Sequence, residues 1–336
     1  MLYIRTDMND VIATGHMMRC IAIAEAAKRL GERTTFLLAD AQAVALLEQR
    51  GFEYIVLNTS WKDMETELGE LQKIIENQNI KSILVDSYQV TPEYFKKLGM
   101  LVKTVYIDDM NVSVYPVDAL ICYADYWEKF NYTRQYRKAD LFLGAEYIPL
   151  RQEFADCKTK NIKPQVENLL LLSGGSDRYH ALDQILECLE VDQYKAIDVI
   201  CGVYNLDYGM LCEKYGQQKN IYIHKSVKNI EDYMVNADVA ITAGGTTLYE
   251  LCAVGTPAIS YSMADNQLEN VKSFRESGLI DCAGDARYDD VGKNVCKYLK
   301  LYRGDWSLRQ KKSMEMRKKV DGKGAERIAK ILKEIS

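Results

Sequence analysis

His16 is placed in the sequence where a side chain could take up a proton during a reaction. It is one of three histidines in 336 residues, and it lies where the polar loop that begins at Asp7 runs into an apolar helical pattern. A histidine ordinarily titrates at pH ~6.5, so it can act as a base at neutral pH. Arg19 would share its side of a helix, where it could hold a phosphate or a carboxylate. The spacing fits equally a partly exposed histidine in a first helical turn.

Two glycine pairs could bind phosphate groups. Gly174-Gly175 and Gly244-Gly245 each follow an apolar strand pattern and precede a helical one. Backbone N–H groups and the positive end of a helix dipole can hold a diphosphate there without a lysine. Neither pair matches the P-loop pattern, and no G-x-G-x-x-G follows the first strand, so a P-loop nucleotidase and a standard NAD enzyme lose support. A tight turn between strand and helix explains the same residues without a ligand.

Other polar residues have both a structural and a functional interpretation. Glu250 follows Thr247 at the spacing of a capping box, but its carboxylate could also bind a ribose. His224 follows a strand pattern and is expected to line the site through its backbone, whereas His180 is expected at the surface. Three scattered histidines and the absence of a C-x-x-C pair argue against a zinc site, and neither a metal nor a cofactor is expected.

The elements that would position these residues alternate between strands and helices, the pattern of a doubly wound parallel α/β sheet. We predict two Rossmann-like domains facing a cleft: residues 1–148, a linker at 149–166, residues 167–320 and a C-terminal helix at 321–336. The expected strands are Leu2–Arg5, Thr34–Leu38, Tyr54–Leu57, Ser82–Val85, Thr104–Ile107 and Ala119–Cys122, then Asn168–Leu172, Ala196–Ile200, Ile221–Ile223, Val239–Thr242 and Ala258–Tyr261.

Polar residues fall at the carboxyl ends of these expected strands, which is the edge where ligands bind in open parallel sheets. Asp7, Asp40, Asp86 and Asp108-Asp109 do so in the first half, and the glycine pairs do so in the second. For any single acidic residue or glycine, an ordinary strand end is the simpler explanation. The repetition in both halves favours a ligand-binding cleft.

Composition limits the class of protein and of partner. Hydrophobic residues make up 48% and charged residues 27%, and the net charge is −5, so this is a globular chain with no general attraction to nucleic acid or anionic lipid. The nine cysteines are an odd number and lie mostly in apolar runs, as do thiols in a reducing compartment. No secretory pattern and no apolar run of about 18 residues occurs, so we expect a cytoplasmic protein without a membrane span.

The sequence resembles the hydrolases of pseudaminic acid biosynthesis that act on UDP-2,4-diacetamido-2,4,6-trideoxy-β-L-altropyranose, together with their spore-coat polysaccharide relatives. The glycine segments are shared with the wider group of two-domain glycosyltransferases, including the peptidoglycan N-acetylglucosaminyl transferase. The family usually has a glycine where this chain has Ala13. The matching segments, in order, are Arg5-Thr6-Asp7, Thr14-Gly15-His16-Met17-Met18-Arg19-Cys20, Asp86-Ser87-Tyr88, Ile107-Asp108-Asp109, Ser173-Gly174-Gly175-Ser176-Asp177, Ala243-Gly244-Gly245-Thr246-Thr247-Leu248-Tyr249-Glu250 and Ala264-Asp265-Asn266-Gln267.

This resemblance implies a GT-B fold and a metal-independent enzyme that cleaves a UDP-sugar at the anomeric carbon to UDP and free sugar, with inversion. The second domain would hold UDP, with Glu250 on the ribose and both glycine pairs around the diphosphate. His16 would be the base that activates water. The candidate catalytic residues are His16, Tyr88 and Asp7, and the candidate substrate-binding residues are Arg19, Gly15, Asp109, Gly174, Gly175, His224, Gly244, Gly245, Thr246, Glu250, Asn266 and Gln267.

Two other functions stay open at this point. A GT-B glycosyltransferase would use the same UDP site with an acceptor hydroxyl in place of water. A non-catalytic subunit of a polysaccharide assembly complex would bind a sugar nucleotide without turnover. The group formed by Asp7, His16 and Arg19 favours an enzyme over a binding subunit.

Overall fold

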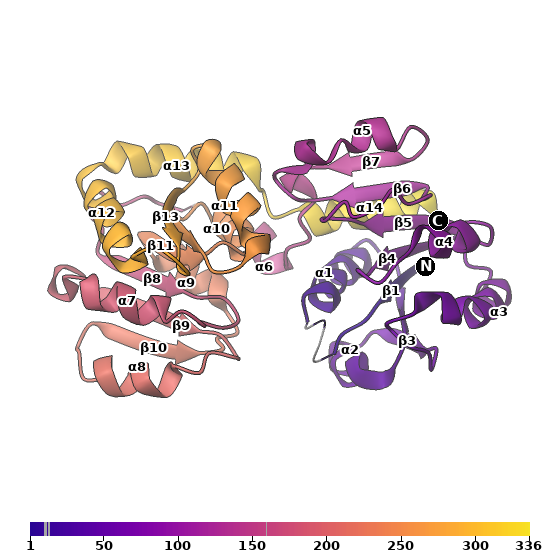
Figure 1. Cartoon of the computed structure of the whole chain (residues 1–336), viewed down its shortest axis with the longest axis horizontal. Helices are drawn as coiled ribbons and strands as arrows, with labels where there is room; N and C mark the ends of the chain where they lie inside the picture. The colour runs from indigo at the N-terminus through magenta and orange to yellow at the C-terminus, as the bar shows by residue number, and fades with distance from the viewer. Residues whose placement is uncertain (10–11, 13, 159) are drawn as a thin grey trace. The chain divides into compact units, whose positions relative to one another are not determined.

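The computed structural model describes residues 1–336 except 10, 11, 13 and 159. The chain forms two compact units, each built on one parallel sheet (Figure 1). Unit 1 comprises residues 1–152 and 322–336, and unit 2 comprises residues 153–321. The last helix therefore belongs to the unit in which the chain begins. The prediction of two Rossmann-like α/β domains is confirmed.

Unit 1 contains a seven-stranded sheet in the order β3-β2-β1-β4-β5-β6-β7. Every pair of neighbouring strands is parallel, and the strand order reverses between β1 and β4. In doubly wound sheets, ligands bind at the carboxyl ends of the strands at such a reversal. The strands are β1 (Leu2–Thr6), β2 (Thr34–Leu38), β3 (Glu53–Val56), β4 (Ser82–Asp86), β5 (Lys103–Ile107), β6 (Ala119–Cys122) and β7 (Asp140–Leu143).

Helices cover both faces of this sheet. The apolar faces of α3 and α4 bury Leu71, Ile75 and Phe95 in a core shared with the strands, while α1 packs against α14 over β1 and β4. The helix α14 contributes Ile328 and Leu332, which are buried as their helical spacing predicts. The helices of unit 1 are α1 (Gly15–Arg29), α2 (Val44–Arg50), α3 (Leu68–Gln78), α4 (Pro92–Leu98), α5 (Tyr132–Gln135) and α14 (Gly324–Ile335), and α6 (Gln152–Ala155) lies where the chain passes to unit 2.

Unit 2 contains a six-stranded parallel sheet in the order β10-β9-β8-β11-β12-β13. The reversal of strand order falls between β8 and β11, which pair directly. The strands are β8 (Asn168–Leu172), β9 (Ala196–Cys201), β10 (Ile221–Lys225), β11 (Val239–Ala243), β12 (Ala258–Ser262) and β13 (Asp281–Asp285). The helices are α7 (Ala181–Cys188), α8 (Tyr208–Tyr215), α9 (Ile230–Asn236), α10 (Thr247–Val254), α11 (Asp265–Glu276), α12 (Val291–Gly304) and α13 (Trp306–Lys319).

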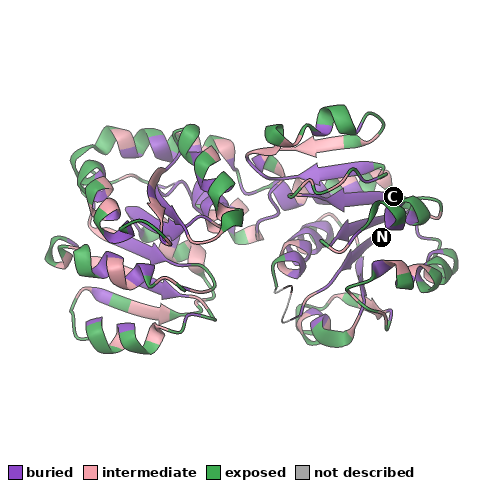
Figure 2. Ribbon diagram, viewed as in Figure 1, coloured by how far each residue is buried: buried purple, intermediate pink, exposed green. Residues whose placement is uncertain are grey.

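The central strands are buried on both faces, and the helices expose one side (Figure 2). This explains why the central strands consist of continuous apolar runs rather than alternating residues. Within the described part of the chain, no helix combines the length and the hydrophobicity needed to cross a membrane. The sequence analysis missed β7 and β13, which are both edge strands. β13 has the polar sequence Asp281-Cys282-Ala283-Gly284-Asp285, since an edge strand needs only one pairing partner.

The basic C-terminal segment uses its charge inside the fold. Ser313 Oγ donates to the carbonyl of Gly255, and Arg317 donates to that of Val254, at the C-terminal end of α10. Lys312 Nζ lies 3.1 Å from the carbonyl of Gly278, just beyond the end of α11. Cationic and hydroxyl donors are favourable there because the last carbonyls of a helix lack intrahelical partners. These three residues of α13 therefore attach it to the C-terminal ends of α10 and α11.

A buried network of ion pairs connects strand β1 of unit 1 to Glu67. Arg5 on β1 is fully buried and donates from Nε to Glu67 Oε1 at 2.8 Å, and from a terminal nitrogen to Asp7 Oδ2 at 2.5 Å. Tyr94 also donates to Glu67, at 2.9 Å. Burial alone would lower the pKa of Arg5, but Glu67 and then Asp7 raise it above its usual value. Arg5 therefore stays charged and is held between two carboxylates of the protein.

Replacing Glu67→Gln should destabilise unit 1 strongly, because it leaves the buried Arg5 cation with only one carboxylate. We expect a loss of about 3 kcal/mol in the free energy of unfolding, measured by urea denaturation followed by circular dichroism. The matched control is Glu70→Gln, which removes an exposed pair with Lys73 and should cost less than about 0.5 kcal/mol. Equal losses in both variants would contradict the assignment of the network as a structural anchor.

Candidate active site

The pair formed by His16 and Asp86 is the central feature of unit 1. His16 lies in the first turn of α1 and is 7% exposed, and Asp86 is the last residue of β4 and is fully buried. His16 Nδ1 lies 2.7 Å from Asp86 Oδ1. Nδ1 also lies 2.9 Å from Arg19 Nη2, which can only donate, but the contact to the carboxylate, which can only accept, is the shorter of the two. We therefore assign the proton of the imidazole to Nδ1, which leaves Nε2 as the nitrogen that can take a proton. Sequence analysis gave Asp86 no role in the site.

Arg19 holds this pair in place. Its Nε donates to Asp86 Oδ2 at 2.6 Å, and its Nη1 donates to Asp109 Oδ2 at 2.9 Å and also contacts Tyr123 Oη. Burial would raise the pKa of Asp86, but the charge of Arg19 and then the interaction with His16 outweigh it and hold that pKa well below its usual value. The predicted role of Arg19 as a ligand for phosphate or carboxylate must be revised, because both carboxylates that it binds belong to the protein itself.

Tyr88 and Asp109 form the outer part of the same cluster. Tyr88 Oη donates to Asp109 Oδ1 at 2.9 Å, and its ring meets the His16 imidazole edge-on, with 4.4 Å between the ring centroids. Tyr123 Oη also donates to Asp109, at 2.6 Å. Burial and then the charge of Asp109 raise the pKa of Tyr88 above its usual value, so the phenol stays protonated. Tyr88 therefore limits the orientation of His16, and the carboxylate of Asp109 is committed to protein donors.

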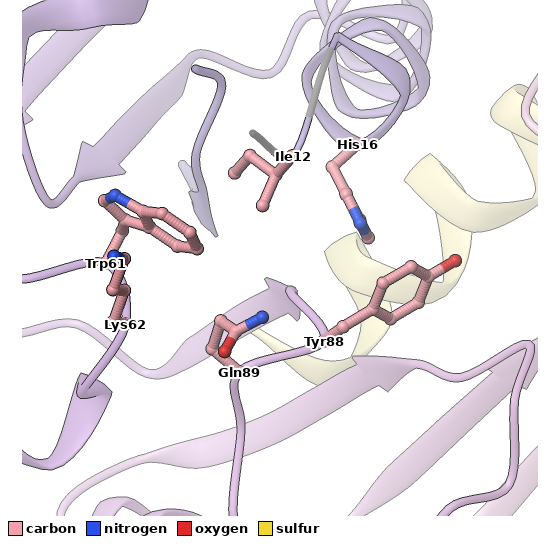
Figure 3. A pocket seen from close by; sticks show the side chains of 6 residues that line it. All are labelled: Ile12, His16, Trp61, Lys62, Tyr88 and Gln89. Atoms are coloured by element: carbon pink, nitrogen blue, oxygen red, sulfur yellow. The ribbon is translucent and has the colours of Figure 1, made fainter. Parts of the chain in front are cut away.

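A pocket of about 570 Å³ opens beside His16. His16 and Tyr88 lie on one side of it, and Trp61 and Lys62 on the opposite side (Figure 3). Such a volume, with an aromatic wall and a few polar groups, is typical of a small-molecule site. The complete lining is Ile12, His16, Trp61, Lys62, Tyr88 and Gln89. Sequence analysis missed Trp61, Lys62 and Gln89 because they follow no recognisable motif.

Asp7 does not line this pocket, and the contacts of its carboxylate are with the protein itself, so they lend no support to the predicted catalytic role. Its Oδ2 accepts from Arg5, and its Oδ1 accepts from the backbone N–H of Ala39 at 2.8 Å. Oδ1 therefore joins the end of β1 to the end of β2, and Oδ2 is held by Arg5 of β1 itself. The sequence pattern placed Asp7 correctly at a strand end, but it could not show that the buried Arg5 beside it would claim the carboxylate.

The start of α1 offers open space. A Cβ atom added at Gly15 would have no neighbour within 4 Å, so packing does not require glycine there. Thr14 is the N-cap residue, but its side chain makes no capping hydrogen bond. Ala13, where the resembling family has glycine, lies outside the described residues.

The two glycine pairs of unit 2 differ in their surroundings. Gly174 has a φ of 76°, a left-handed conformation that glycine adopts without strain, and Gly174 and Gly175 are both exposed. The helix that follows them, α7, is capped by Asp177, whose oxygens accept from the N–H groups of Ala181 and Leu182 at 2.9 Å each. The predicted phosphate site at this helix start is therefore already filled by a carboxylate of the protein.

The second pair leads into α10, whose N-cap residue Thr246 makes no side-chain capping bond. Gly244 is required by packing, because a Cβ atom there would come within 2.1 Å of Val271 Cγ2 on α11. Asn270 donates from Nδ2 to the carbonyls of Gly244 at 2.9 Å and Gly245 at 3.3 Å. Asn270 thus fixes the backbone of the turn through its carbonyl groups. Sequence analysis missed this residue.

The other predicted ligands of unit 2 lie in several environments. Glu250 is the fourth residue of α10, so the predicted capping box at Thr247 is wrong: the helix begins at Thr247 itself. Asn266 is exposed on α11, whereas Gln267 Oε1 accepts from the N–H of Met263 at 2.9 Å. His224 lies within β10 rather than in a loop, with Nε2 2.8 Å from Asp198 Oδ1.

Comparison with known proteins finds a family match in the second half of the chain. Residues 169–328 match the model of the glycosyltransferase family 28 C-terminal domain. The chain is 24% identical over 306 residues to an uncharacterized protein of Methanocaldococcus jannaschii, a match that covers 87% of this chain and 58% of that protein. The chain thus spans less than two thirds of that relative. It is also 24% identical to the spore coat polysaccharide biosynthesis protein SpsG of Bacillus subtilis, over 96% of this chain and 94% of that one.

A further relative matches only part of the chain. The UDP-N-acetylglucosamine–N-acetylmuramyl-(pentapeptide) pyrophosphoryl-undecaprenol N-acetylglucosamine transferase of Campylobacter jejuni is 29% identical over 160 residues, which is 44% of this chain and 45% of that enzyme. Among solved structures, MurG of Acinetobacter baumannii superposes with a TM-score of 0.70 at 11% identity, over 99% of this chain and 100% of that one. The fold is therefore that of the two-domain glycosyltransferases.

The same fold also occurs in enzymes with a different activity. The UDP-GlcNAc 2-epimerase of Methanocaldococcus jannaschii superposes with a TM-score of 0.61 at 15% identity, over 99% of each chain. The fold alone therefore does not choose between reactions, and the function has to be argued from the site.

Replacing Asp86→Asn should destabilise unit 1 in a pH-dependent way. The folded pKa of Asp86 is depressed, so its stabilisation is fully present above the carboxyl's ordinary pKa of about 4 and is lost as the pH falls below it. We expect a difference of about 3 kcal/mol from the parent protein at pH 7 that shrinks towards pH 3 in urea titrations. The exposed carboxylate variant Asp63→Asn should show a small difference at both pH values. A loss that does not change with pH would contradict the ion pair.

Replacing Gly244→Ala should displace α11, because the new methyl group meets Val271 Cγ2. Overpacking of this kind costs about 1–3 kcal/mol. In the double variant Gly244→Ala with Val271→Ala, the conflicting methyl group is gone, so the two losses should be less than additive by at least about 1 kcal/mol. Thermal unfolding of the four proteins of this cycle measures the coupling. Strict additivity would show that glycine is needed there for another reason.

Proposed function

We propose that the protein is an enzyme that transfers a glycosyl group from a UDP-sugar, with UDP as the leaving group. The observation that carries the proposal is the His16–Asp86 pair at the wall of a pocket in unit 1. The proposal assigns the base to unit 1 and the nucleotide to unit 2. The match to the glycosyltransferase C-terminal domain and the partial likeness to a UDP-N-acetylglucosamine-dependent transferase support the second assignment.

In the proposed reaction, an acceptor hydroxyl attacks the anomeric carbon. A bond forms between that carbon and the acceptor oxygen, and the bond from the carbon to the diphosphate oxygen breaks, with its electron pair leaving on UDP. His16 Nε2 takes the proton of the hydroxyl, while Asp86 holds Nδ1–H and stabilises the imidazolium that forms. Direct displacement inverts the configuration at the anomeric carbon. A positioned base contributes about 10²–10⁴ in rate, so stabilisation of the leaving diphosphate must supply the remainder.

The start of α10 is the proposed diphosphate site. Its first turn follows Gly244-Gly245, and the N-cap residue Thr246 makes no side-chain capping bond there, so the dipole of α10 can act on an anion. By contrast, the start of α7 is held by the carboxylate of Asp177, which would repel a phosphate. This argues that the two glycine pairs do not share the diphosphate equally. Glu250 and Asn266 remain proposed ligands for the nucleotide-sugar.

The acceptor is either a hydroxyl group or water. The match to a glycosyltransferase C-terminal domain and the partial sequence likeness to a transferase favour a hydroxyl group. Hydrolysis, the function implied by the resemblance of the sequence, is the second candidate. It rests on the matching sequence segments; the likeness to a spore coat polysaccharide biosynthesis protein extends over nearly the whole of both chains, but the name of that protein states no reaction. The same base and the same leaving group serve both reactions, so the distinction lies in what occupies the space beside His16.

Replacing His16→Gln should abolish turnover and leave UDP affinity nearly unchanged, because the base does not contribute to nucleotide binding. Parent protein and variant are incubated with UDP-sugars, with and without polysaccharide or lipid-linked acceptors, and UDP release and free sugar are measured. Turnover that requires an acceptor identifies a transferase, and free sugar without one identifies a hydrolase. UDP binding by calorimetry is the control for folding of the variant. Unchanged turnover in His16→Gln would remove this residue from the mechanism.

A further inference from the structure

One wall of the pocket belongs to no motif of the sequence. Trp61 and Lys62 face His16 and Tyr88 across the pocket (Figure 3), and they come from the segment between β3 and the short 3-10 helix Met64–Glu67. In an ordinary surface loop, the residue types at two such positions can be substituted with little effect. The need to connect β3 to the 3-10 helix does not by itself explain why an indole ring lies on the pocket wall opposite a candidate base.

The backbone on both sides of Trp61 is anchored in the core of unit 1. Before it, the N–H of Thr59 donates to the carbonyl of Ala39 at 2.9 Å, at the end of β2. After it, Met64 is 1% exposed, and Glu67 is bound by the buried Arg5. A short segment fixed at both ends holds its side chains with little freedom, so little ordering is needed when a ligand binds. The buried ion-pair network of Arg5, Asp7 and Glu67 thereby fixes the position of this wall.

The chemistry of the pocket fits a sugar ring. Charged groups next to His16 are already neutralised within the protein, because Arg19 pairs with Asp86 and Asp109. What the pocket offers is the indole of Trp61, with the ammonium of Lys62 5.4 Å from the centroid of that ring, together with the amide of Gln89 and the phenol of Tyr88. A pyranose has one face of C–H groups, which packs on an aromatic ring, and an edge of hydroxyl groups, which amides and phenols can bind.

We propose that Trp61 is a specificity-determining residue on which the pyranose ring of the donor lies while its anomeric carbon faces His16. This inference rests on the proposed function, because it takes the pyranose from the UDP-sugar of that reaction. It assigns Trp61 to the sugar and not to the nucleotide. Removing the indole should therefore weaken the contribution of the sugar to binding and leave the contribution of UDP intact.

The test compares UDP with three pyranosyl nucleotides, namely UDP-glucose, UDP-N-acetylglucosamine and UDP-glucuronic acid, by calorimetry on the full chain. In the parent protein, at least one sugar nucleotide should bind more tightly than UDP. In Trp61→Ala, that advantage should fall by about tenfold, as for truncation of a buried aromatic contact, and Trp61→Phe should restore part of it. Trp306→Phe, which alters an exposed tryptophan of α13, is the matched control and should leave all affinities unchanged.

The outcomes separate this inference from the proposed function. If UDP binds but no sugar adds to its affinity in the parent protein, or if Trp61→Ala keeps the full advantage of the sugar, Trp61 does not hold the pyranose and the inference fails. If neither UDP nor any sugar nucleotide binds the parent protein, the proposed function itself fails. An equal loss for UDP and for the sugar nucleotides in Trp61→Ala would place the indole on the nucleotide and also overturn the inference.

Discussion

The carboxylate of Asp86 is the point on which the site in unit 1 depends. It lies at the end of β4, beside the reversal of strand order, and it binds both His16 and Arg19 from α1. A buried carboxylate is unfavourable unless it is paired, and here Arg19 supplies the charge that keeps it ionised. The same contact joins the start of α1 to the sheet and orients the imidazole. The placement of α1 on the sheet and the orientation of the His16 imidazole thus depend on the same carboxylate.

Two arginines of unit 1 each fix the position of one wall of the pocket. Arg19 fixes the wall that carries His16 and Tyr88, through Asp86 and Asp109. Arg5 fixes Glu67, and with it the end of the segment that carries Trp61. Neither guanidinium is offered to a ligand as a free cation, because each pairs with two carboxylates of the protein. The pocket presents the imidazole of His16, the rings of Tyr88 and Trp61, and the amide of Gln89, and the one cation among its described lining residues is Lys62 beside Trp61.

Much of the fold was predictable because parallel strands buried on both faces leave continuous apolar runs. The expected strand at Ala119–Cys122 matches β6, whereas the edge strand β13 was missed because its sequence Asp281–Asp285 is polar. The strand ends also placed His16 and Tyr88 at one edge. What could not be predicted was the choice of partner: Asp7 and Asp86 follow neighbouring strands in the same way, yet only Asp86 meets His16. That choice depends on where Arg5 and Arg19 direct their side chains, and neighbouring residue types do not reveal it.

Similar sequence motifs can have opposite electrostatic consequences, as the two glycine pairs show. Each pair ends a central strand of unit 2 and each precedes a helix. After Gly174-Gly175, however, the chain continues to Asp177 before α7 begins, and that carboxylate accepts the first N–H groups of the helix. After Gly244-Gly245, α10 begins within two residues, and its N-cap side chain makes no such bond. A helix start attracts an anion only while its N–H groups are not already satisfied by a carboxylate. In the proposed reaction, the carboxylate at the start of α7 and the lack of a capping bond from the N-cap residue of α10 together favour α10 as the diphosphate site.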